Sequence, residues 1–187
     1  MDGVGVVSDA RHTGVPELIV VGFTAAAQLL LAQDRPEQAH ALLTELEAVP
    51  EVRTDPYYGS RLSELTRCAL ALGELELAGR LVDGVEPRTP LLRHALAAGR
   101  AQLAEAAGDH EQALVLHAEA AERWQEFGNI PERAYALLGR GRSQLSLGRA
   151  GAEAALGEAR ELFASLGYEP ALAETEALLA QATAAAP

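Results

Sequence analysis

The residues best suited to chemistry in this sequence are two histidines in one predicted helix, His110 and His117, with Glu111 beside the first. A zinc-protease helix carries its two histidines four residues apart, so that both reach one ion and the adjacent glutamate acts as general base. Here the spacing is seven residues, and no third ligand is evident in the sequence. We therefore interpret His110 and Glu111 as turn residues and His117 as a helix-interior side chain.

Two other motifs that could support catalysis lack necessary parts. The run Gly139-Arg140-Gly141-Arg142 resembles a phosphate loop in its glycines, but it lies inside a helical pattern and no lysine follows it. All 15 basic residues are arginine, which also excludes a Schiff-base lysine. Cys68 is the only cysteine and lies mid-helix without a recognisable base, so we expect it in the core. The sequence thus predicts a protein that is not an enzyme and holds no cofactor or metal.

A set of polar residues shares one position in four predicted helices. Each follows directly after a small residue, namely Ala27, Thr66, Ala101 or Gly141. Arginine in such a row can bind a carboxylate through two parallel hydrogen bonds. The alternative is that these positions are ordinary solvated ones, because exposed helix faces are polar in most proteins. The row consists of Gln28, Arg67, Gln102 and Arg142, and its predicted flanking residues are Thr24, Ser63, Glu105 and Tyr135.

Helices must position these residues, because the composition is rich in alanine and leucine and poor in strand formers. The segment around Ile19, Val20 and Val21 also allows a strand, but its length and the alanines after it favour a helix. Prolines and glycines mark the helix boundaries. The predicted helices are Val15–Gln33, Pro36–Ala48, Tyr57–Leu72, Glu74–Val82, Leu91–Ala107, His110–Phe127, Pro131–Leu147, Ala152–Leu166 and Glu169–Ala184.

An alanine recurs early in the second helix of each predicted hairpin, and the intervals between the four are 39, 35 and 39 residues. Four residues after each alanine comes Leu43, Val82, His117 or Leu156, and three residues later Leu46, Val85, Ala120 or Ala159. This recurrence predicts four similar helical hairpins with buried small residues. The alanines are Ala39, Ala78, Ala113 and Ala152.

The hairpins resemble the tetratricopeptide repeat (TPR), a unit of about 34 residues with small residues where its two helices cross. The segment Gly108-Asp109-His110-Glu111-Gln112-Ala113-Leu114 is the best local match, and the resemblance covers residues 18–166. It implies an all-α fold, an α-α superhelix of four TPR-like hairpins in which the first helices line a concave surface. The helix Glu169–Ala184 would cap the last repeat.

A narrower resemblance involves Glu132-Arg133-Ala134-Tyr135-Ala136-Leu137-Leu138-Gly139-Arg140-Gly141, Leu147-Gly148-Arg149, Ala159-Arg160-Glu161-Leu162-Phe163 and Ala171-Leu172-Ala173-Glu174. These segments are similar to the C-terminal helical repeats of bacterial ATPase-linked regulators, both LuxR-type transcription factors and adenylate-cyclase-like proteins. The resemblance implies a regulatory domain of a larger signalling or transcription protein. Its ATPase, cyclase and DNA-binding motifs do not occur in this sequence, so those activities are not implied.

The charge limits the class of partner. A net charge of −12 disfavours nucleic acid and anionic membrane surfaces, which both attract positive charge. The most apolar run, residues 18–32, is short for a membrane span, and the single cysteine fits a reducing cytoplasmic setting. We expect residues 1–13 to be a disordered leader or the ragged edge of an excised domain, and residues 14–187 to form a single domain.

The sequence therefore predicts a protein–protein interaction or regulatory module that binds a peptide or partner segment in a concave helical groove, with an acidic segment as one candidate ligand. Two alternatives remain at this point. One is a regulatory domain that senses a small molecule, which a large closed pocket would favour. The other is a self-associating scaffold, a homo-oligomer held by exposed apolar surface at an end repeat.

Overall fold

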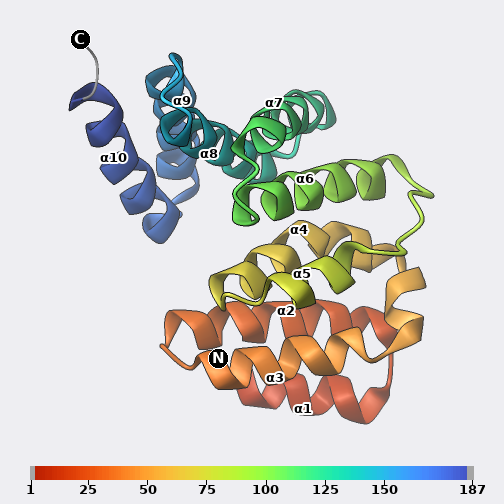
Figure 1. Ribbon diagram of the computed structural model, residues 1–187. Helices are drawn as coiled ribbons and strands as arrows, with labels where there is room; N and C mark the ends of the chain where they lie inside the picture. The colour runs from red at the N-terminus through yellow and green to blue at the C-terminus, as the bar shows by residue number, and fades with distance from the viewer. Residues whose placement is uncertain (1–2, 185–187) are drawn as a thin grey trace. The chain divides into compact units, whose positions relative to one another are not determined.

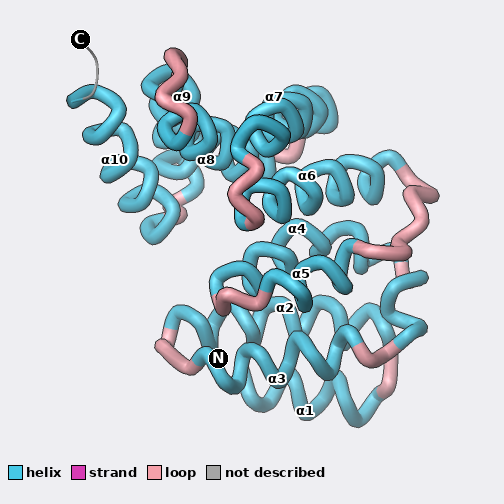
Figure 2. The backbone as a smooth tube through the Cα atoms, viewed as in Figure 1, coloured by secondary structure: helices cyan, strands magenta, loops and turns pink. Residues whose placement is uncertain are grey.

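The computed structural model describes residues 3–184, with side chains from residue 7 onward. Every regular element in this range is helical, and no strand occurs within it, so the predicted all-α class is confirmed (Figures 1 and 2). In chain order the elements are α1 (Gly3–Thr13), α2 (Pro16–Ala32), α3 (Pro36–Glu47), the 3-10 helix η1 (Pro50–Thr54), α4 (Pro56–Ala71), α5 (Leu75–Val82), α6 (Pro90–Ala106), α7 (His110–Phe127), α8 (Ile130–Ser146), α9 (Ala152–Leu166) and α10 (Glu169–Ala184).

The helices form two compact units, one ending at Gly99 and the other beginning at Arg100, so that the boundary falls inside α6. That residues 14–187 form a single domain stays a prediction from the sequence. In the first unit α2 packs against α1, α3 and α4, and α4 packs against α5. In the second unit α8 packs against α7 and α9, and α10 packs against α9 (Figure 1). The superhelical arrangement of TPR-like hairpins stays a prediction.

Residues 3–13 form a helix. The sequence predicted a disordered leader or the ragged edge of an excised domain there. Val7 and Ala10 on this helix are buried, and the Arg11 guanidinium donates to the Glu45 carboxylate on α3, with Nε 2.6 Å from Oε1. The same guanidinium lies over the ring of Phe23, 5.4 Å from its centroid. A helix of 11 residues has little stability alone, so these contacts with α2 and α3 are what stabilise it.

Local sequence signals explain the helix boundaries. Proline occupies the first turn of α2, α3, α4 and α8, where its missing N–H has no helical partner to lose. Asp55, Asp109 and Asn129 cap α4, α7 and α8 by accepting a backbone N–H with their side-chain oxygens. The αL conformation of Gly128 and Gly167 ends α7 and α9. The segment that also allowed a strand is helical, within α2.

The recurring small residues lie in the core, as predicted. The four alanines of the second helices are buried, and so are the residues four and seven positions after each of them. The small residues of the first helices, Ala27, Thr66, Ala101 and Gly141, are buried as well. The sequence recurrence therefore identifies correctly which face of each helix is packed against its neighbours.

Helix α8 approaches both of its neighbours through glycine. A Cβ on Gly141 would lie 2.5 Å from Cγ of Leu156 on α9, and one on Gly139 would lie 2.3 Å from Cε1 of His117 on α7. Both distances are far below van der Waals contact, so neither position accepts a side chain without movement. The Gly139-Arg140-Gly141 run is thus a packing element, in agreement with the prediction that Gly141 marks a helix crossing.

Candidate functional site

The predicted row of polar residues divides between the two units. In the first unit, Gln28 is exposed on α2 and Arg67 is half-buried on α4, where it has partners of its own. The two flanking hydroxyl residues point inward instead: Thr24 is buried and donates to the Val20 carbonyl at 2.6 Å, and Ser63 is also buried. These two residues are therefore not exposed on their helices, in contrast to the expectation that they flank an open groove.

In the second unit, Gln102 is buried on α6, so it does not present its amide to solvent as an exposed row would require. Tyr135 on α8 is half-buried and makes an edge-on contact with Phe163 on α9, with ring centroids 4.9 Å apart. The remaining pair of predicted residues, Glu105 on α6 and Arg142 on α8, is in direct contact. This pair forms the centre of a polar cluster.

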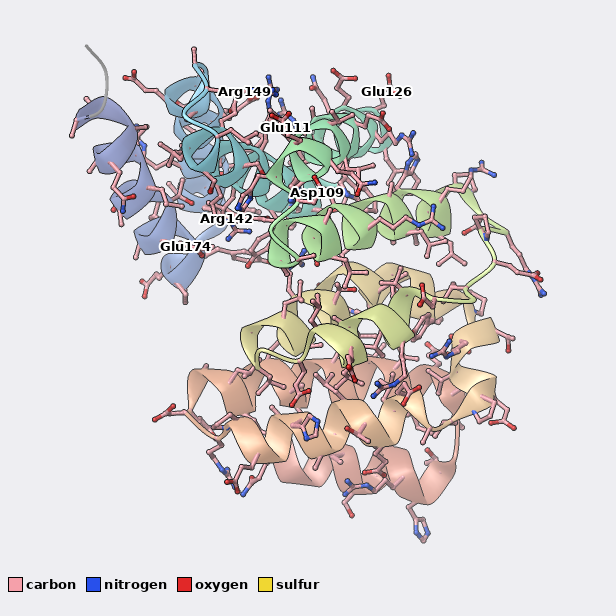
Figure 3. All side chains as sticks on the ribbon, viewed as in Figure 1. Asp109, Glu111, Glu126, Arg142, Arg149 and Glu174 are labelled. Carbon is pink, nitrogen blue, oxygen red and sulfur yellow. The ribbon has the colours of Figure 1, made fainter. Side chains whose placement is uncertain are left out.

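Arg142 binds two carboxylates from two different helices. Its Nε and Nη2 donate to the two oxygens of Glu105 at 2.6 and 3.1 Å, and its Nη1 donates to Glu174 Oε1 on α10 at 2.7 Å. Figure 3 shows the Arg142 and Glu174 side chains directed toward each other from α8 and α10. The guanidinium thus makes a two-bond contact with Glu105, the geometry that favours carboxylates, and a single contact with Glu174.

A histidine completes the cluster from α7. Nε2 of His117 lies 2.9 Å from Oε2 of Glu105, and because a carboxylate only accepts, Nε2 carries the hydrogen. The His117 side chain is 3% exposed and that of Glu105 14%, whereas those of Arg142 and Glu174 are 35% and 48% exposed. The cluster is therefore closed at its histidine end and open to solvent at its Glu174 end. We call these four residues, Glu105, His117, Arg142 and Glu174, the Arg142 cluster.

The electrostatics of the Arg142 cluster favour ionised groups. Burial raises the pKa of Glu105. The hydrogen bond from His117 and the charge and hydrogen bonds of Arg142 lower this pKa by more than burial raises it, so the pKa lies below its ordinary value. Burial lowers the pKa of Arg142, and the two carboxylates raise it above its ordinary value. Glu105 is thus an ionised carboxylate that is hydrogen-bonded to both His117 and Arg142. The more exposed Glu174 makes one hydrogen bond, with Nη1 of Arg142.

Sequence reasoning overlooked the roles of His117 and Glu174. A signal existed for His117, which occupies the recurring position that holds Leu43, Val82 and Leu156 in the other hairpins; a histidine there needs a polar partner once it is buried. Glu174 gave a weaker signal, because a glutamate three residues after a small residue is common on any helix. Its partner Arg142 lies 32 residues earlier in the chain.

The accessibility and protonation of His117 and Cys68 limit the chemistry that these two side chains can do. The His117 side chain is 3% exposed and its Nε2 is hydrogen-bonded to Glu105, so little of the imidazole is accessible from solvent. Burial raises the pKa of Cys68 to about 11, which keeps this thiol protonated. Among the described residues, no three histidine, cysteine, aspartate or glutamate side chains are grouped so that they could hold a metal ion.

Comparisons of the chain with family models, with curated proteins and with solved structures find no match. Between residues 3 and 184, no helix combines the length and the apolar character needed to cross a bilayer.

Proposed function

We propose that this protein is a non-catalytic interaction module, and that its second unit binds an acidic segment of a partner protein at Arg142. The observation that supports the proposal is the Nη1–Glu174 contact of 2.7 Å, in which a half-exposed carboxylate from a separate helix sits on a guanidinium that Glu105 already orients. A partner's carboxylate in the place of Glu174 would meet the same donor. Arg67 and Gln28 remain candidate contacts in the first unit.

The Arg142 guanidinium is preorganised for a carboxylate ligand. Holding a free arginine side chain in one geometry costs conformational entropy when it binds a ligand. Two hydrogen bonds to Glu105 hold the Arg142 guanidinium in place before any partner binds. The entropy of ordering this side chain is therefore lost when the protein folds and not when it binds. Hydrogen bonds between charged groups contribute about 1.5–3 kcal/mol each when they are partly desolvated, which is enough to select acidic over neutral segments.

The same proposal includes the wider setting that the sequence resemblance implies. The module would belong to a larger bacterial signalling or transcription regulator in the cytoplasm, where it would receive a protein partner and not nucleic acid or a membrane. The net charge of −12 supports the exclusion of nucleic acid.

A titration with two matched peptides tests the binding function. Both would be helical peptides of equal length, one with several glutamates and one with glutamine at each of those positions. We expect the glutamate peptide to shift the Arg142 Nε–H signal in NMR spectra of the full chain and to bind more weakly at high salt. The Arg142→Gln variant should bind both peptides equally. Equal binding of the two peptides by the wild-type chain would contradict the proposal.

The matched control is Arg149→Gln. Arg149 pairs with Glu111 at 2.7 Å, and both side chains are at least half exposed (Figure 3). This pair has the same chemistry as Arg142 with Glu174 but lacks the second carboxylate that orients the guanidinium. We expect Arg149→Gln to leave the binding of the glutamate peptide unchanged. If it weakens binding as much as Arg142→Gln does, general electrostatic attraction explains the binding and the assigned site is wrong.

One observation favours a second candidate function, a self-associating scaffold. Phe127, Ile130 and Tyr168 are large apolar side chains that are 47%, 49% and 40% exposed. Phe127 and Ile130 line a shallow hollow with Pro131 and Leu166, at the turn between α7 and α8. Light scattering over a concentration series tests this candidate: a dimer that Phe127→Ser converts to a monomer would support it, and a monomer at all concentrations would exclude it.

A further inference from the structure

The C-terminal helix α10 is attached to its unit by small side chains. Of its described side chains it buries two, Ala171 and Thr175, whereas Leu172, Leu178 and Leu179 are half-buried. The preceding helix α9 buries Leu156 and Phe163 together with three alanines. Because the hydrophobic contribution scales with the apolar area removed from water, α10 is held much less strongly than α9. Weakly packed terminal elements are the ones that open first in a native protein.

The face of α10 that contacts the rest of its unit carries a definite pattern. Ala171, Glu174 and Thr175 are separated by three and four residues, so they lie on one side of the helix. Thr175 donates its hydroxyl to the Ala171 carbonyl at 2.6 Å, so this buried polar group has its partner within the helix. On the same face, the Glu174 carboxylate accepts a hydrogen bond from Nη1 of Arg142 on α8. The pattern is a small residue, two others, a glutamate and a second small residue.

We infer that the surface of α8 and α9 beneath α10 is an interaction surface for a partner helix with this same pattern, and that α10 is its internal occupant. The inference rests on the function proposed above and names both the partner and the regulation of the site. Helix α10 shows which kind of helix this surface accepts, because it places small residues at the crossing and a carboxylate on Arg142. A partner helix would replace α10 and place its own glutamate on Nη1.

Covalent attachment gives α10 an advantage over a free helix. A tethered segment has an effective concentration in the millimolar range, so a free helix with equal contacts binds weakly while α10 is docked. The apparent affinity of the partner is reduced by the fraction of molecules in which the surface is uncovered. A change that weakens only the docking of α10 should therefore raise the affinity for a helix supplied in trans.

The test uses the full chain and, as ligand, a fluorescein-labelled synthetic peptide of residues 169–184. The Glu174→Gln variant of the chain removes the internal carboxylate and keeps Arg142. We expect it to bind the peptide about tenfold more tightly than the wild-type chain, as measured by fluorescence anisotropy, because one charged hydrogen bond is lost from the internal competitor alone. A peptide that itself carries Glu174→Gln should not gain this affinity.

Two further variants make the experiment specific. Glu176→Gln removes an exposed carboxylate two residues along the same helix, with the same change of net charge, and should bind the peptide as the wild-type chain does. The double variant Glu174→Gln with Arg142→Gln should lose the tenfold gain. Equal effects of Glu174→Gln and Glu176→Gln would overturn the inference, because the effect would then follow from net charge.

The outcomes also separate this inference from the binding function. Suppose that the glutamate peptide binds in an Arg142-dependent way but Glu174→Gln does not tighten the binding of the 169–184 peptide. The proposed binding function is then supported, and the inference that α10 competes with a partner helix is wrong. If neither is observed, both proposals fail. A Glu174→Gln chain that becomes a dimer in light scattering would show that a second copy's α10 takes the surface, which overturns the assignment to a partner protein.

Hydrogen exchange of the wild-type chain provides a measurement that needs no variant. The amides of α10 should exchange at least about tenfold faster than those of α8, because α10 must open while the rest of the unit stays folded. Equal protection of α10 and α8 would show that α10 leaves only when the whole unit unfolds, and would overturn the inference.

Discussion

The imidazole of His117 occupies the space where a side chain at Gly139 would begin. A Cβ on Gly139 would lie 2.3 Å from Cε1 and 2.4 Å from Nε2 of the ring. The absence of a side chain at position 139 thus leaves room for His117 of α7 to reach Glu105. Glu105, oriented by this hydrogen bond, in turn accepts the hydrogen bonds of Arg142. The packing of α7 on α8 and the geometry of the Arg142 cluster therefore both require a glycine at position 139.

The first prediction concerns this contact. Gly139→Ala should displace the imidazole and lower the free energy of unfolding by about 1–3 kcal/mol, as overpacking of a core does. Urea denaturation measures the loss. Gly157→Ala is the control: it is also a glycine within a helix, but no atom lies within 4 Å of its added Cβ. There the better helix propensity of alanine should stabilise the protein by up to about 1 kcal/mol. Equal effects of the two changes would contradict the role of Gly139.

The second prediction concerns pH. Because its folded-state pKa lies below the ordinary value of 4.5, ionised Glu105 stabilises the fold above that pH. This contribution is lost as the pH falls from about 5 through 4.5 and on through the lower folded-state pKa. Glu105→Gln should therefore be less stable than the wild-type chain at pH 7 and lose less stability between pH 5 and pH 3.

Urea midpoints measured across that pH range would test the prediction, with Glu161→Gln as the control. Glu161 is exposed on α9, and its replacement should leave the acid-dependent loss as it is in the wild-type chain. A Glu105→Gln chain with the full wild-type acid dependence would mean that Glu105 does not carry this stabilisation.

The third prediction concerns the end of α5. The Tyr58 side chain is buried and donates its hydroxyl to the Leu81 carbonyl at 2.7 Å, which pairs a carbonyl that the helix end leaves open. Tyr58→Phe should cost about 1–3 kcal/mol of unfolding free energy, because the carbonyl stays buried without its donor. Tyr57→Phe removes the hydroxyl of the neighbouring tyrosine, which is 46% exposed, and should leave the denaturation midpoint unchanged.

The fourth prediction concerns the crossing of α8 and α9. Gly141→Ala should destabilise the unit, since its Cβ would lie 2.5 Å from Cγ of Leu156. Leu156→Ala alone should cost about 2–5 kcal/mol through the cavity that it leaves. Combined, the two changes should cost less than their separate effects together, by at least about 0.5 kcal/mol, because the alanine at 141 then has room. Strict additivity in a denaturation cycle would contradict the contact.

Much of the fold could be predicted from the sequence because its signals are local. Prolines at first turns, capping side chains and glycines at helix ends depend on neighbours within four residues, and they gave nine of the helices with small boundary shifts. The recurrence of small residues also predicted the buried faces, from Ala39 to Ala159, since helical periodicity alone decides which side chains share a face.

Which helices and side chains pack against those buried faces is decided by the tertiary structure. The helix Gly3–Thr13 exists through contacts with α2 and α3, including an Arg11–Glu45 pair 34 residues apart, which no local signal reveals. The Arg142 cluster joins residues 12, 32 and 37 positions apart from four helices. Periodicity predicted Gln28, Arg67, Gln102 and Arg142 at one repeat position, but their exposure differs from helix to helix. The reason is physical: sequence fixes the spacing of residues around a helix, whereas the rotation of each helix against its neighbours depends on how side chains such as His117 and Leu156 fill the space that glycines leave.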